Sequence, residues 1–565
     1  MKVVIVGGVA GGASAAARIR RLDEHAQIIM IERSGYVSYA NCGLPYYVGG
    51  VIKEQEELTL QTPESFWDRF RIDVRVRQEV TAINPAEKTV IVRTLDSGKS
   101  YTEAYDKLLL APGAKPTVPA LSGVSSERVF TLRTVEDTLR IRRFAEDQKP
   151  KTAVLAGGGF IGLEMAENLV EMGVSVTIVQ RPKQLLAPLD ADMASFVHAE
   201  MRRHGVTLRL GETVTGFWQD GDSVLTLLED SETLHSDMVL LAIGVTPDTH
   251  LAKEAGLELG IRGSIAVNER METSVPDIYA VGDAVEVTHF VTGQKALILL
   301  AGPANKQGRI AADNICGGNS RFTGSQGSSV LKLFGLTAAS TGINEKAAQT
   351  AGIAYDKVVL FPASHAAYYP GAQSMAMKVL YEKESLRLLG AQIVGGESVD
   401  KRIDVLATVI RAKMTALELT ELDLSYAPPY SSAKDPVNMA GFMIEDLERG
   451  KVRQFHWNEV EGLPCDGSAA TLLDVRTAWE YQRGHLDGFR NVPLDDLREH
   501  LDELDRSKPV YVNCQTGLRS YLACRLLTQY GFSCSHLSGG YSFYQVVTKE
   551  QQTARSAYPC GMEKL

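Results

Sequence analysis

The sequence predicts an α/β protein made of several domains. Residues 2–32 and 152–180 each read as a buried strand, a glycine-rich turn, a helix and a second strand. This order is typical of a parallel sheet covered by helices. Residues 455–565 again alternate strands and helices. The chain of 565 residues is too long for one hydrophobic core and should hold about three to five domains.

Composition narrows the classes of function. A net charge of −10 argues against nucleic acid or an anionic membrane as the main partner. The seven cysteines have no regular spacing and form no C-x-x-C or Cys/His cluster, so we expect neither a disulfide framework nor a metal site. The chain enters a strand at once and has no long apolar stretch, which predicts a cytoplasmic protein in a reducing compartment.

The first glycine turn has the features of a dinucleotide site. The valine-rich run Lys2–Val6 leads into GGVAGG and a small-residue helix, and the next strand ends at Glu32. A tight turn and the N–H groups at a helix start bind a pyrophosphate, and an acid at this position binds a ribose hydroxyl. Val9 replaces the middle glycine, so a simple strand-helix connection is the alternative, and Glu32 favours the cofactor. The predicted contacts are Gly7, Gly8, Ala10, Gly11, Gly12, Glu32 and Arg33.

The second turn carries the complete G-x-G-x-x-G pattern. The next strand ends in Gln180 and Arg181, where an NAD-specific site has an acid. An arginine there can meet a 2′-phosphate, so NADPH or use of both nicotinamide cofactors is indicated, while a solvated Arg181 is the alternative. The predicted contacts are Gly157, Gly159, Phe160, Ile161, Gly162, Gln180 and Arg181.

Three further segments carry a family resemblance. They are LLLAPGAKP (108–116), LLAIGVTPDT (240–249) and TSVPDIYAVGDAV (273–285). Their order, together with the two turns, resembles the pyridine nucleotide–disulfide oxidoreductases over roughly residues 1–450. The resemblance implies FAD on the first turn and beside Gly282 and Asp283, and NAD(P)H on the second turn.

Cys42 is the candidate redox centre. It lies in SYANCGLPYY, and Tyr46 and Tyr47 stand where many members of this family have a second cysteine. The segment resembles the single-cysteine branch of coenzyme A-disulfide reductases and their persulfide-reducing relatives. NADH oxidases and peroxidases, which cycle one cysteine through sulfenic acid, are the close alternative. A nearby helix start and flavin favour the thiolate, whereas a buried core cysteine is disfavoured by the flanking Asn, Gly and Pro.

Basic and polar residues on the first helix point to an anionic substrate. Ser14, Arg18 and Arg21 share one face, and guanidinium groups bind phosphates such as those of coenzyme A. A solvated helix face is the alternative. The resemblance adds further substrate contacts at Ser38, Asn41, Asn305 and Lys434.

Tyrosines complete the first predicted site. The resemblance implies a homodimer in which Tyr368 and Tyr426, with Tyr430 as an alternative, reach the cysteine of the other subunit. A phenol there can act as acid or hydrogen-bond donor. The alternative is that these tyrosines are ordinary interface residues.

The C-terminal region resembles a rhodanese domain. It carries LLDVR, GHLDGFRNVP and a strand that ends in the loop from Cys514 to Arg519. Backbone N–H groups, Arg519 and the following helix dipole should stabilise a persulfide on Cys514, while Asp474 and Arg476 brace the loop. No role is assigned to Cys316, Cys465, Cys524, Cys534 or Cys560.

The predicted domains follow from these segments. They are an FAD-binding domain (1–112 and 242–322), an NAD(P)H-binding domain (113–241), an α/β dimerisation domain (323–445), a linker (446–454) and a rhodanese domain (455–565). The resemblance implies a reductase of CoA disulfide, CoA persulfide or polysulfide, coupled to sulfur transfer. The alternatives are an NAD(P)H oxidase or peroxidase that cycles Cys42, and a redox-sensing or sulfur-carrier partner protein.

Overall fold

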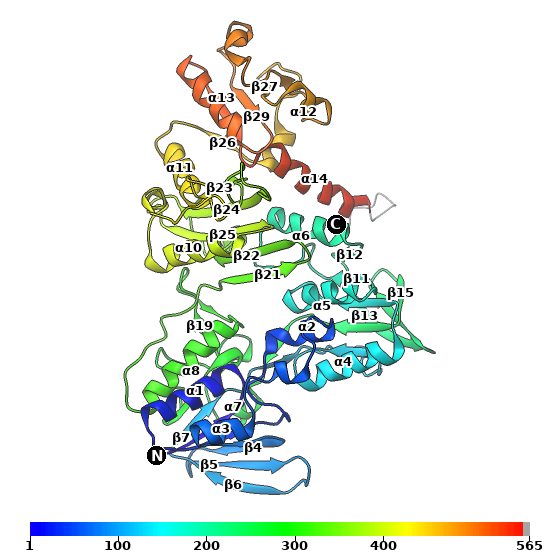
Figure 1. The fold of residues 1–565 in the computed structure, drawn as a ribbon, viewed down its shortest axis with the longest axis vertical. Helices are drawn as coiled ribbons and strands as arrows, with labels where there is room; N and C mark the ends of the chain where they lie inside the picture. The colour runs from blue at the N-terminus through cyan, green and yellow to red at the C-terminus, as the bar shows by residue number, and fades with distance from the viewer. Residues whose placement is uncertain (557–565) are drawn as a thin grey trace. The chain divides into compact units, whose positions relative to one another are not determined.

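The computed structural model describes residues 1–556, with side chains up to residue 553. Two compact units are present (Figure 1). The first consists of Met1–Lys183 and His204–Gly327, and the second of Gln184–Arg203 with the chain from Ser328 onward. Within residues 1–556, no helix has both the length and the apolar composition that crossing a membrane requires.

The first unit contains a five-stranded parallel sheet. Its strands are ordered β18 (Ile278–Ala280), β7 (Lys107–Leu110), β1 (Lys2–Val6), β2 (Gln27–Ile31) and β3 (Ile72–Arg75). Val3, Val4 and Ile5 are fully buried in the central strand, as expected where helices cover both faces. The helices α1 (Ala10–Leu22) and α8 (Ala301–Ile315) pack side by side (Figure 1).

Smaller elements surround this sheet. The strands β4–β6 form an antiparallel sheet. The bounds are α2 (Leu44–Val48), α3 (Pro63–Phe70), β4 (Gln78–Asn84), β5 (Thr89–Thr94), β6 (Ser100–Ala104), α7 (His250–Glu254), β19 (Val287–Thr288) and β20 (Lys295–Ala296).

A second parallel sheet follows the same plan. Its order is β12 (Thr207–Leu210), β11 (Ser175–Gln180), β10 (Thr152–Ala156), β16 (Met238–Leu241) and β9 (Val129–Thr131). The associated elements are β8 (Ala114–Pro116), α4 (Val135–Gln148), α5 (Phe160–Glu171), β13 (Val214–Asp220), β14 (Ser223–Leu228), β15 (Thr233–Ser236) and β17 (Val245–Pro247).

The second unit begins with an antiparallel sheet. Its order is β21 (Ser329–Leu333), β22 (Leu336–Gly342), β25 (Leu388–Gly395), β24 (Met375–Glu382) and β23 (Tyr355–Leu360). The helices here are α6 (Ala191–Arg203), α9 (Glu345–Thr350), α10 (Val399–Ala412) and α11 (Pro436–Glu448). The helix α6 packs on β21, β22 and β25. Residues Gln184–Arg203 therefore belong to this unit, although the sequence boundaries put them in the NAD(P)H-binding domain.

The C-terminal part contains the last sheet. Parallel strands are ordered β26 (Gln454–Phe455), β30 (Cys534–Leu537), β29 (Val510–Asn513), β27 (Thr471–Asp474) and β28 (Arg490–Asn491). They are accompanied by α12 (Ala478–Gln482), α13 (Leu518–Gln529) and α14 (Gly540–Ser556). The predicted α/β class is confirmed, and Cys560 lies outside the described residues.

Candidate active site

The first glycine turn leaves no room for side chains. Gly7 has φ +95°, and a Cβ on it would overlap the carbonyl oxygen of Ala111. A Cβ on Gly12 would overlap the carbonyl oxygen of Gly7. These positions need glycine so that α1 can start directly beneath the end of β1.

Glu32, just after the next strand, hydrogen-bonds to this turn. Its side chain is only 8% exposed and accepts hydrogen bonds from the Gly8 N–H at 2.8 Å and the Ser34 N–H at 2.9 Å. Burial raises the pKa of Glu32, and these two backbone donors oppose the rise. Each carboxylate oxygen keeps a second lone pair, so a ribose hydroxyl can still donate to Glu32.

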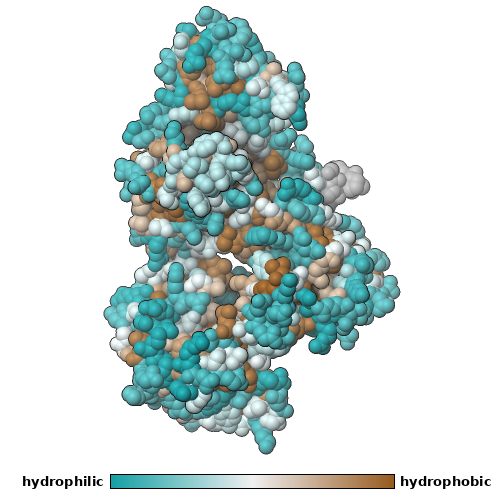
Figure 2. All heavy atoms as spheres, in the orientation of Figure 1, coloured by the Kyte–Doolittle hydropathy of each residue, from teal (hydrophilic) through white to brown (hydrophobic). Residues whose placement is uncertain are grey.

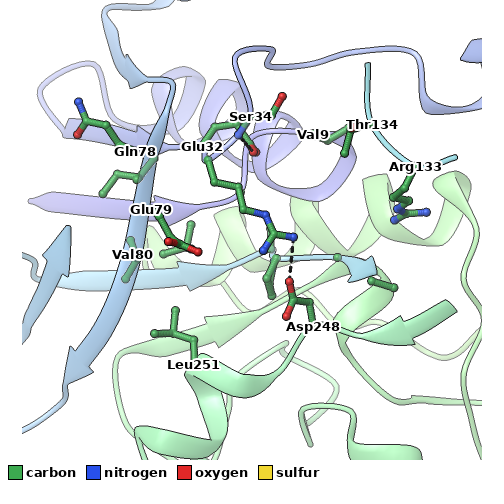
Figure 3. A pocket seen from close by; sticks show the side chains of 18 of the residues that line it. Val9, Glu32, Ser34, Gln78, Glu79, Val80, Arg133, Thr134, Asp248 and Leu251 are labelled. Carbon is green, nitrogen blue, oxygen red and sulfur yellow. Dashed lines mark hydrogen bonds and ion pairs between the residues drawn. The ribbon is translucent and has the colours of Figure 1, made fainter. Parts of the chain in front are cut away.

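A cavity of about 550 Å³ opens from this turn (Figure 3). Its walls come from the ends of β1 and β2, from β4 and β8, from α4 and α7, and from the adjoining loops, all in the same unit. Arg33 spans one side and pairs with Asp248 at 2.9 Å. The cavity has the size of a cofactor site and lies where an open α/β sheet binds its ligands. Its lining includes Gly7, Val9, Glu32, Arg33, Tyr39, Asn41, Gln78, Gly113, Arg133 and Asp248.

Asp283 is linked to this cavity by the side chain of Arg133. Arg133 lines the cavity and donates to Asp283 at 2.7 Å. Gly282 has φ +81°, and its N–H donates to Gln307 at 2.7 Å. Hydrogen bonds to Gln307 and from Arg133 therefore fix the predicted Gly282-Asp283 pair in place. Arg133 is a cavity residue that the sequence analysis did not identify.

The second turn repeats the geometry with one change. Gly157 has φ +113°, and a Cβ on Gly162 would overlap the carbonyl oxygen of Gly157. Gln180 accepts from the Gly158 N–H at 3.0 Å, which matches the bond from Gly8 to Glu32. Arg181 is exposed, so its guanidinium is available to a 2′-phosphate.

Cys42 occupies a short 3₁₀ turn, Asn41–Gly43, just before α2. The six cysteines among the described residues are all free. Two effects raise the pKa of Cys42: first the partial removal of water around the thiol, and then the Glu164 carboxylate, whereas Arg133 lowers it. The expected thiolate stabilisation included a bound flavin; the protein groups alone raise the pKa of Cys42, and the helix that follows, α2, has only five residues.

Glu164 is a second group that the sequence did not reveal. It accepts a hydrogen bond from the Tyr46 hydroxyl at 3.3 Å. Burial raises the pKa of Glu164 to about 7. The residue lies on α5, far along the chain from Cys42, so that only the fold brings the two together.

A second cavity of about 380 Å³ collects much of the predicted substrate set. Ser14, Arg21, Ser38 and Asn305 all line it, and Ser14 hydrogen-bonds Asn305. The lining also includes Arg309, Gln61, Phe66 and Phe70, together with Ala13 and Ala17. Arg309 follows Asn305 by four residues on α8, a helical spacing that could have revealed it.

The other predicted substrate residues lie elsewhere. Arg18 pairs with Asp313 at 2.7 Å and is absent from the lining of the cavity. Asn41 lines the larger cavity instead. Lys434 belongs to the second unit, where it is exposed.

Tyr368 and Tyr426 form a pair in the second unit. Their hydroxyl oxygens are 2.7 Å apart, and their side chains are 75% and 46% exposed. The hydrogen bond to Tyr426 raises the pKa of Tyr368. Tyr430 is exposed as well. The fold thus joins the two predicted tyrosines and leaves their phenols open to an incoming group.

The C-terminal thiol sits at the end of β29. Cys514 is buried, and its sulfur accepts from the Gly517 N–H at 3.1 Å. Its thiol also contacts the Ser520 hydroxyl at 3.3 Å. A Cβ on Gly540 would meet the backbone of this loop, so α14 starts close against it. The geometry is that of an anion-binding loop at a helix start.

The remaining described cysteines belong neither to the Cys42 turn nor to the Cys514 loop, although Cys514 is among the groups that raise the pKa of Cys524, after burial and Cys534. The Cys534 thiol donates to the Cys524 carbonyl at 3.3 Å inside the C-terminal domain. Cys465 donates to the Leu463 carbonyl at 3.4 Å. Cys316 caps the end of α8. These contacts are compatible with structural roles.

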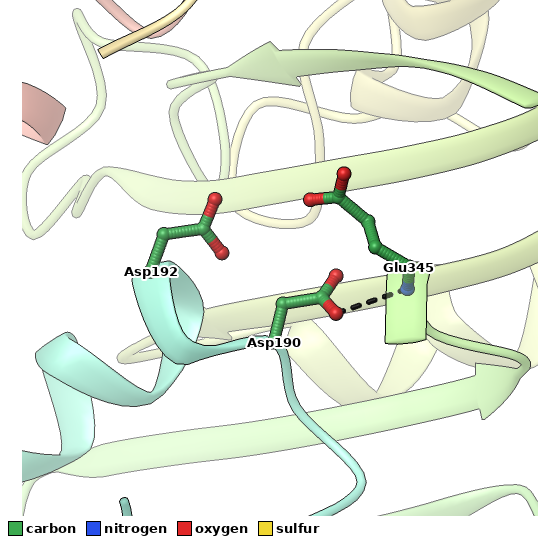
Figure 4. A group of neighbouring side chains, drawn as sticks. All are labelled: Asp190, Asp192 and Glu345. Carbon is green, nitrogen blue, oxygen red and sulfur yellow. Dashed lines mark hydrogen bonds between the residues drawn. The ribbon is translucent and has the colours of Figure 1, made fainter. Parts of the chain in front are cut away.

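Three acidic residues gather in the second unit (Figure 4): Asp190, Asp192 and Glu345. The buried Lys378 ammonium lies among them, 3.0 Å from Asp190 and 2.9 Å from Asp192, and pairs with Glu345. Burial alone would raise the pKa of Glu345, but Lys378 and Lys357 lower it to about 2. The cluster is an ion-pair network in which Lys378 and Lys357 offset part of the acidic charge.

Two glycine turns at strand ends, a cofactor-sized cavity and a nearby single thiol define a dinucleotide-dependent thiol oxidoreductase. The family model "Pyridine nucleotide-disulphide oxidoreductase" matches residues 1–308, and its dimerisation domain matches residues 329–436. A "Rhodanese-like domain" model matches residues 457–545. The chain belongs to the pyridine nucleotide-disulphide oxidoreductases and carries a C-terminal rhodanese-like domain.

Individual relatives support the same assignment. The chain is 36% identical to the coenzyme A disulfide reductase of Staphylococcus aureus over 442 residues, which is 78% of this chain and 99% of the relative. The structure of reduced Bacillus anthracis CoADR-RHD is similar with a TM-score of 0.94 and 47% identity, over 97% of this chain and 98% of that one. An NAD-dependent persulfide reductase from A. fulgidus has a TM-score of 0.90 and 38% identity, over 96% and 100%.

These findings confirm the predicted family and the predicted cofactors, FAD and NAD(P)H. The residues around the two turns fit such groups, because glycines, buried N–H groups and Glu32 stand where a pyrophosphate and a ribose need them. The individual contact residues remain predictions.

Proposed function

We propose that this protein is an NAD(P)H-dependent reductase of CoA disulfide, CoA persulfide or polysulfide that works through Cys42. One observation carries the proposal. The segment Ser38 to Asn41, which leads directly into Cys42, contributes to both cavities, since Ser38 lines the smaller one and Tyr39 and Asn41 line the larger. A thiol in that position can exchange electrons with one side and sulfur with the other.

The larger cavity and the two glycine turns hold the cofactors. FAD, when bound, supplies a two-electron carrier between the nicotinamide and a thiol. The N–H groups of the first turn, Glu32 and Arg133 bind and orient it. Gln180 and Arg181 bind the adenosine end of the nicotinamide cofactor.

The smaller cavity selects the substrate. Arg21 and Arg309 present guanidinium groups to the phosphates of a CoA derivative, and Ser14, Ser38 and Asn305 supply hydrogen bonds. Cys42 then attacks the substrate sulfur as a thiolate and releases a thiol. Phe66 and Phe70 give the cavity an apolar wall for the rest of the ligand.

We further propose that the protein works as a homodimer. The match to a dimerisation domain and the exposed phenols of Tyr368 and Tyr426 support this arrangement. In the dimer, the partner subunit's Tyr368 and the partner subunit's Tyr426 donate a proton or hydrogen bond to the sulfur leaving Cys42.

Cys514 adds sulfur transfer to this reductase. Its loop supplies N–H groups to a persulfide sulfur, as the Gly517 bond indicates. Because both Cys42 and Cys514 must be thiols to react, a reducing, cytoplasmic setting suits the protein.

Anaerobic rapid mixing tests the reductase. The NAD(P)H-reduced protein is mixed separately with CoA disulfide, CoA persulfide, polysulfide and peroxide, and flavin reoxidation is followed. We expect fast reoxidation by a sulfur substrate that is lost in Cys42→Ser. Fast reoxidation by peroxide alone would assign the protein to the oxidase and peroxidase branch.

A further inference from the structure

Arg519 does not present a free charge to the Cys514 loop. Its two terminal nitrogens donate to both carboxylate oxygens of Glu480, at 2.7 and 2.6 Å. This ion pair lowers the pKa of Glu480 to about 2, with the Arg519 hydrogen bonds as the main cause. A bidentate pair of this kind is strong and largely cancels the positive field.

The second arginine near the loop is also neutralised. Arg476 is 1% exposed and pairs with the buried Asp474 at 2.7 Å. Its other terminal nitrogen donates to the Gln515 side chain at 3.2 Å, and Gln515 in turn donates to Ser542 at 2.7 Å. Gln515, the loop residue that follows Cys514, is uncharged, and these two hydrogen bonds hold its side chain in place.

Exposed apolar side chains lie on the two helices that Arg519 and Glu480 belong to. Leu518 is the first residue of α13, next to Arg519, and Trp479 precedes Glu480 on α12; their side chains are 58% and 65% exposed. The Arg483 guanidinium stacks on the Trp479 ring, 4.5 Å from its centroid. Leu522, one turn further along α13, is exposed too. Figure 2 shows hydrophobic side chains at the surface over the part of the C-terminal domain where Figure 1 places α13.

A thiosulfate dianion and an organic persulfide differ in what they need from such a site. Thiosulfate brings two negative charges, so it requires unpaired cations at the loop itself, where Arg519 and Arg476 are both paired with carboxylates. A persulfide brings at most one negative charge, which the Gly517 N–H and the start of α13 can accommodate. Its organic part can also pack on Leu518 and Trp479.

We propose that Cys514 takes its sulfur from persulfides of organic thiols and discriminates against thiosulfate. The proposal rests on the sulfur-transfer function given above and names its donor class. The Cys514 thiolate attacks the outer sulfur of R–S–SH, a new S–S bond forms and the old one breaks. The leaving thiolate takes the proton of the persulfide and departs as R–SH, so Cys514 carries a persulfide anion and no outside oxidant is used.

The test measures sulfur loading of Cys514 in the full chain without NAD(P)H. Wild-type protein is mixed anaerobically with glutathione persulfide or with thiosulfate, and peptide mass spectrometry follows the gain of one sulfur on the Cys514 peptide separately from the Cys42 peptide. We expect the persulfide to load Cys514 at least about tenfold faster than thiosulfate.

Glu480→Gln tests the physical cause. Removing the carboxylate frees the Arg519 charge, so thiosulfate loading should rise about tenfold while persulfide loading changes little. Glu503→Gln is the matched control, because Glu503 pairs with the exposed Arg490 in the same domain and should leave both rates unchanged. Circular dichroism verifies that both variants are folded.

The possible outcomes distinguish a failure of the proposed donor class from a failure of the sulfur-transfer function. Equal or faster loading of the wild type by thiosulfate overturns the donor class and leaves sulfur transfer standing. A wild-type preference for persulfide that Glu480→Gln does not reduce overturns charge compensation as its cause. If neither donor loads Cys514, the sulfur-transfer function itself is wrong.

Discussion

At the scale of single residues, Glu164 contributes to the electrostatic environment of Cys42. Burial is the main cause of the raised pKa of the thiol, and the Glu164 carboxylate adds to it. Burial raises the pKa of Glu164 itself to about 7. Above about pH 7, Glu164 therefore opposes formation of the thiolate that attacks sulfur. Below that pH it is protonated and neutral, and it can then donate a proton within this site.

Glu164→Gln should lower the pKa of Cys42, since the variant removes a negative charge near the thiol. The expected difference from wild type is present above about pH 7 and disappears below it, where Glu164 is already neutral. The rate of Cys42 alkylation as a function of pH measures it. Glu171→Gln, an exposed acid on the same helix, is the control. An unchanged or raised pKa in Glu164→Gln would contradict the assigned role of this carboxylate.

Variants of Arg21 and Arg18 should distinguish a role in substrate binding from a role in stability. Arg21 lines the smaller cavity, so Arg21→Ala should raise the KM for a CoA substrate about tenfold or more with little change in kcat. Arg18 is bound to Asp313, so Arg18→Ala should change KM less and lower the melting temperature instead. Steady-state kinetics and thermal unfolding of both variants check this. A larger KM effect from Arg18 would return it to the substrate set.

At the scale of elements, the two strand-turn-helix units depend on glycines for different reasons. A Cβ on Gly162 would overlap the Gly157 carbonyl, whereas a Cβ on Gly159 meets no protein atom within 4 Å. Gly159 therefore leaves space for the cofactor, while Gly162 lets α5 pack against the turn.

Gly162→Ala should destabilise the protein by a few kcal/mol, because backbone must move to admit the methyl group. Gly159→Ala should keep wild-type stability and raise the KM for NAD(P)H, since the methyl group enters the space of the pyrophosphate. Thermal unfolding and nicotinamide titration distinguish the two. Equal losses of stability in both variants would argue against this division of roles.

Sequence patterns predicted these elements well where the signal is local. The strands and helices around both glycine turns follow from buried runs, turn residues and spacing within about 30 residues. The sequence boundaries put Gln184–Arg203 in the NAD(P)H-binding domain, whereas α6 packs on the sheet of the second unit, a choice that no local signal encodes.

At the scale of the whole molecule, the two thiols should support separable reactions. Cys514→Ser should abolish sulfur transfer while reduction of CoA disulfide stays near the wild-type rate. Cys42→Ser should do the reverse and still allow NAD(P)H to reduce the flavin. Assays of both activities in both variants provide the measurement. Loss of both activities in either single variant would show that the thiols act in one obligatory cycle.

The sequence by itself determined the family, both glycine turns, Cys42 and the Cys514 loop, because each depends on residue types at short, regular spacing. Only the tertiary structure decided the surroundings of these groups. Glu164 adds to the raised pKa of Cys42, Asp313 pairs with Arg18, which does not line the smaller cavity, and Glu480 pairs with Arg519. Electrostatic effects fall with distance in space and not along the chain, so partners far apart in sequence set the charge of each site.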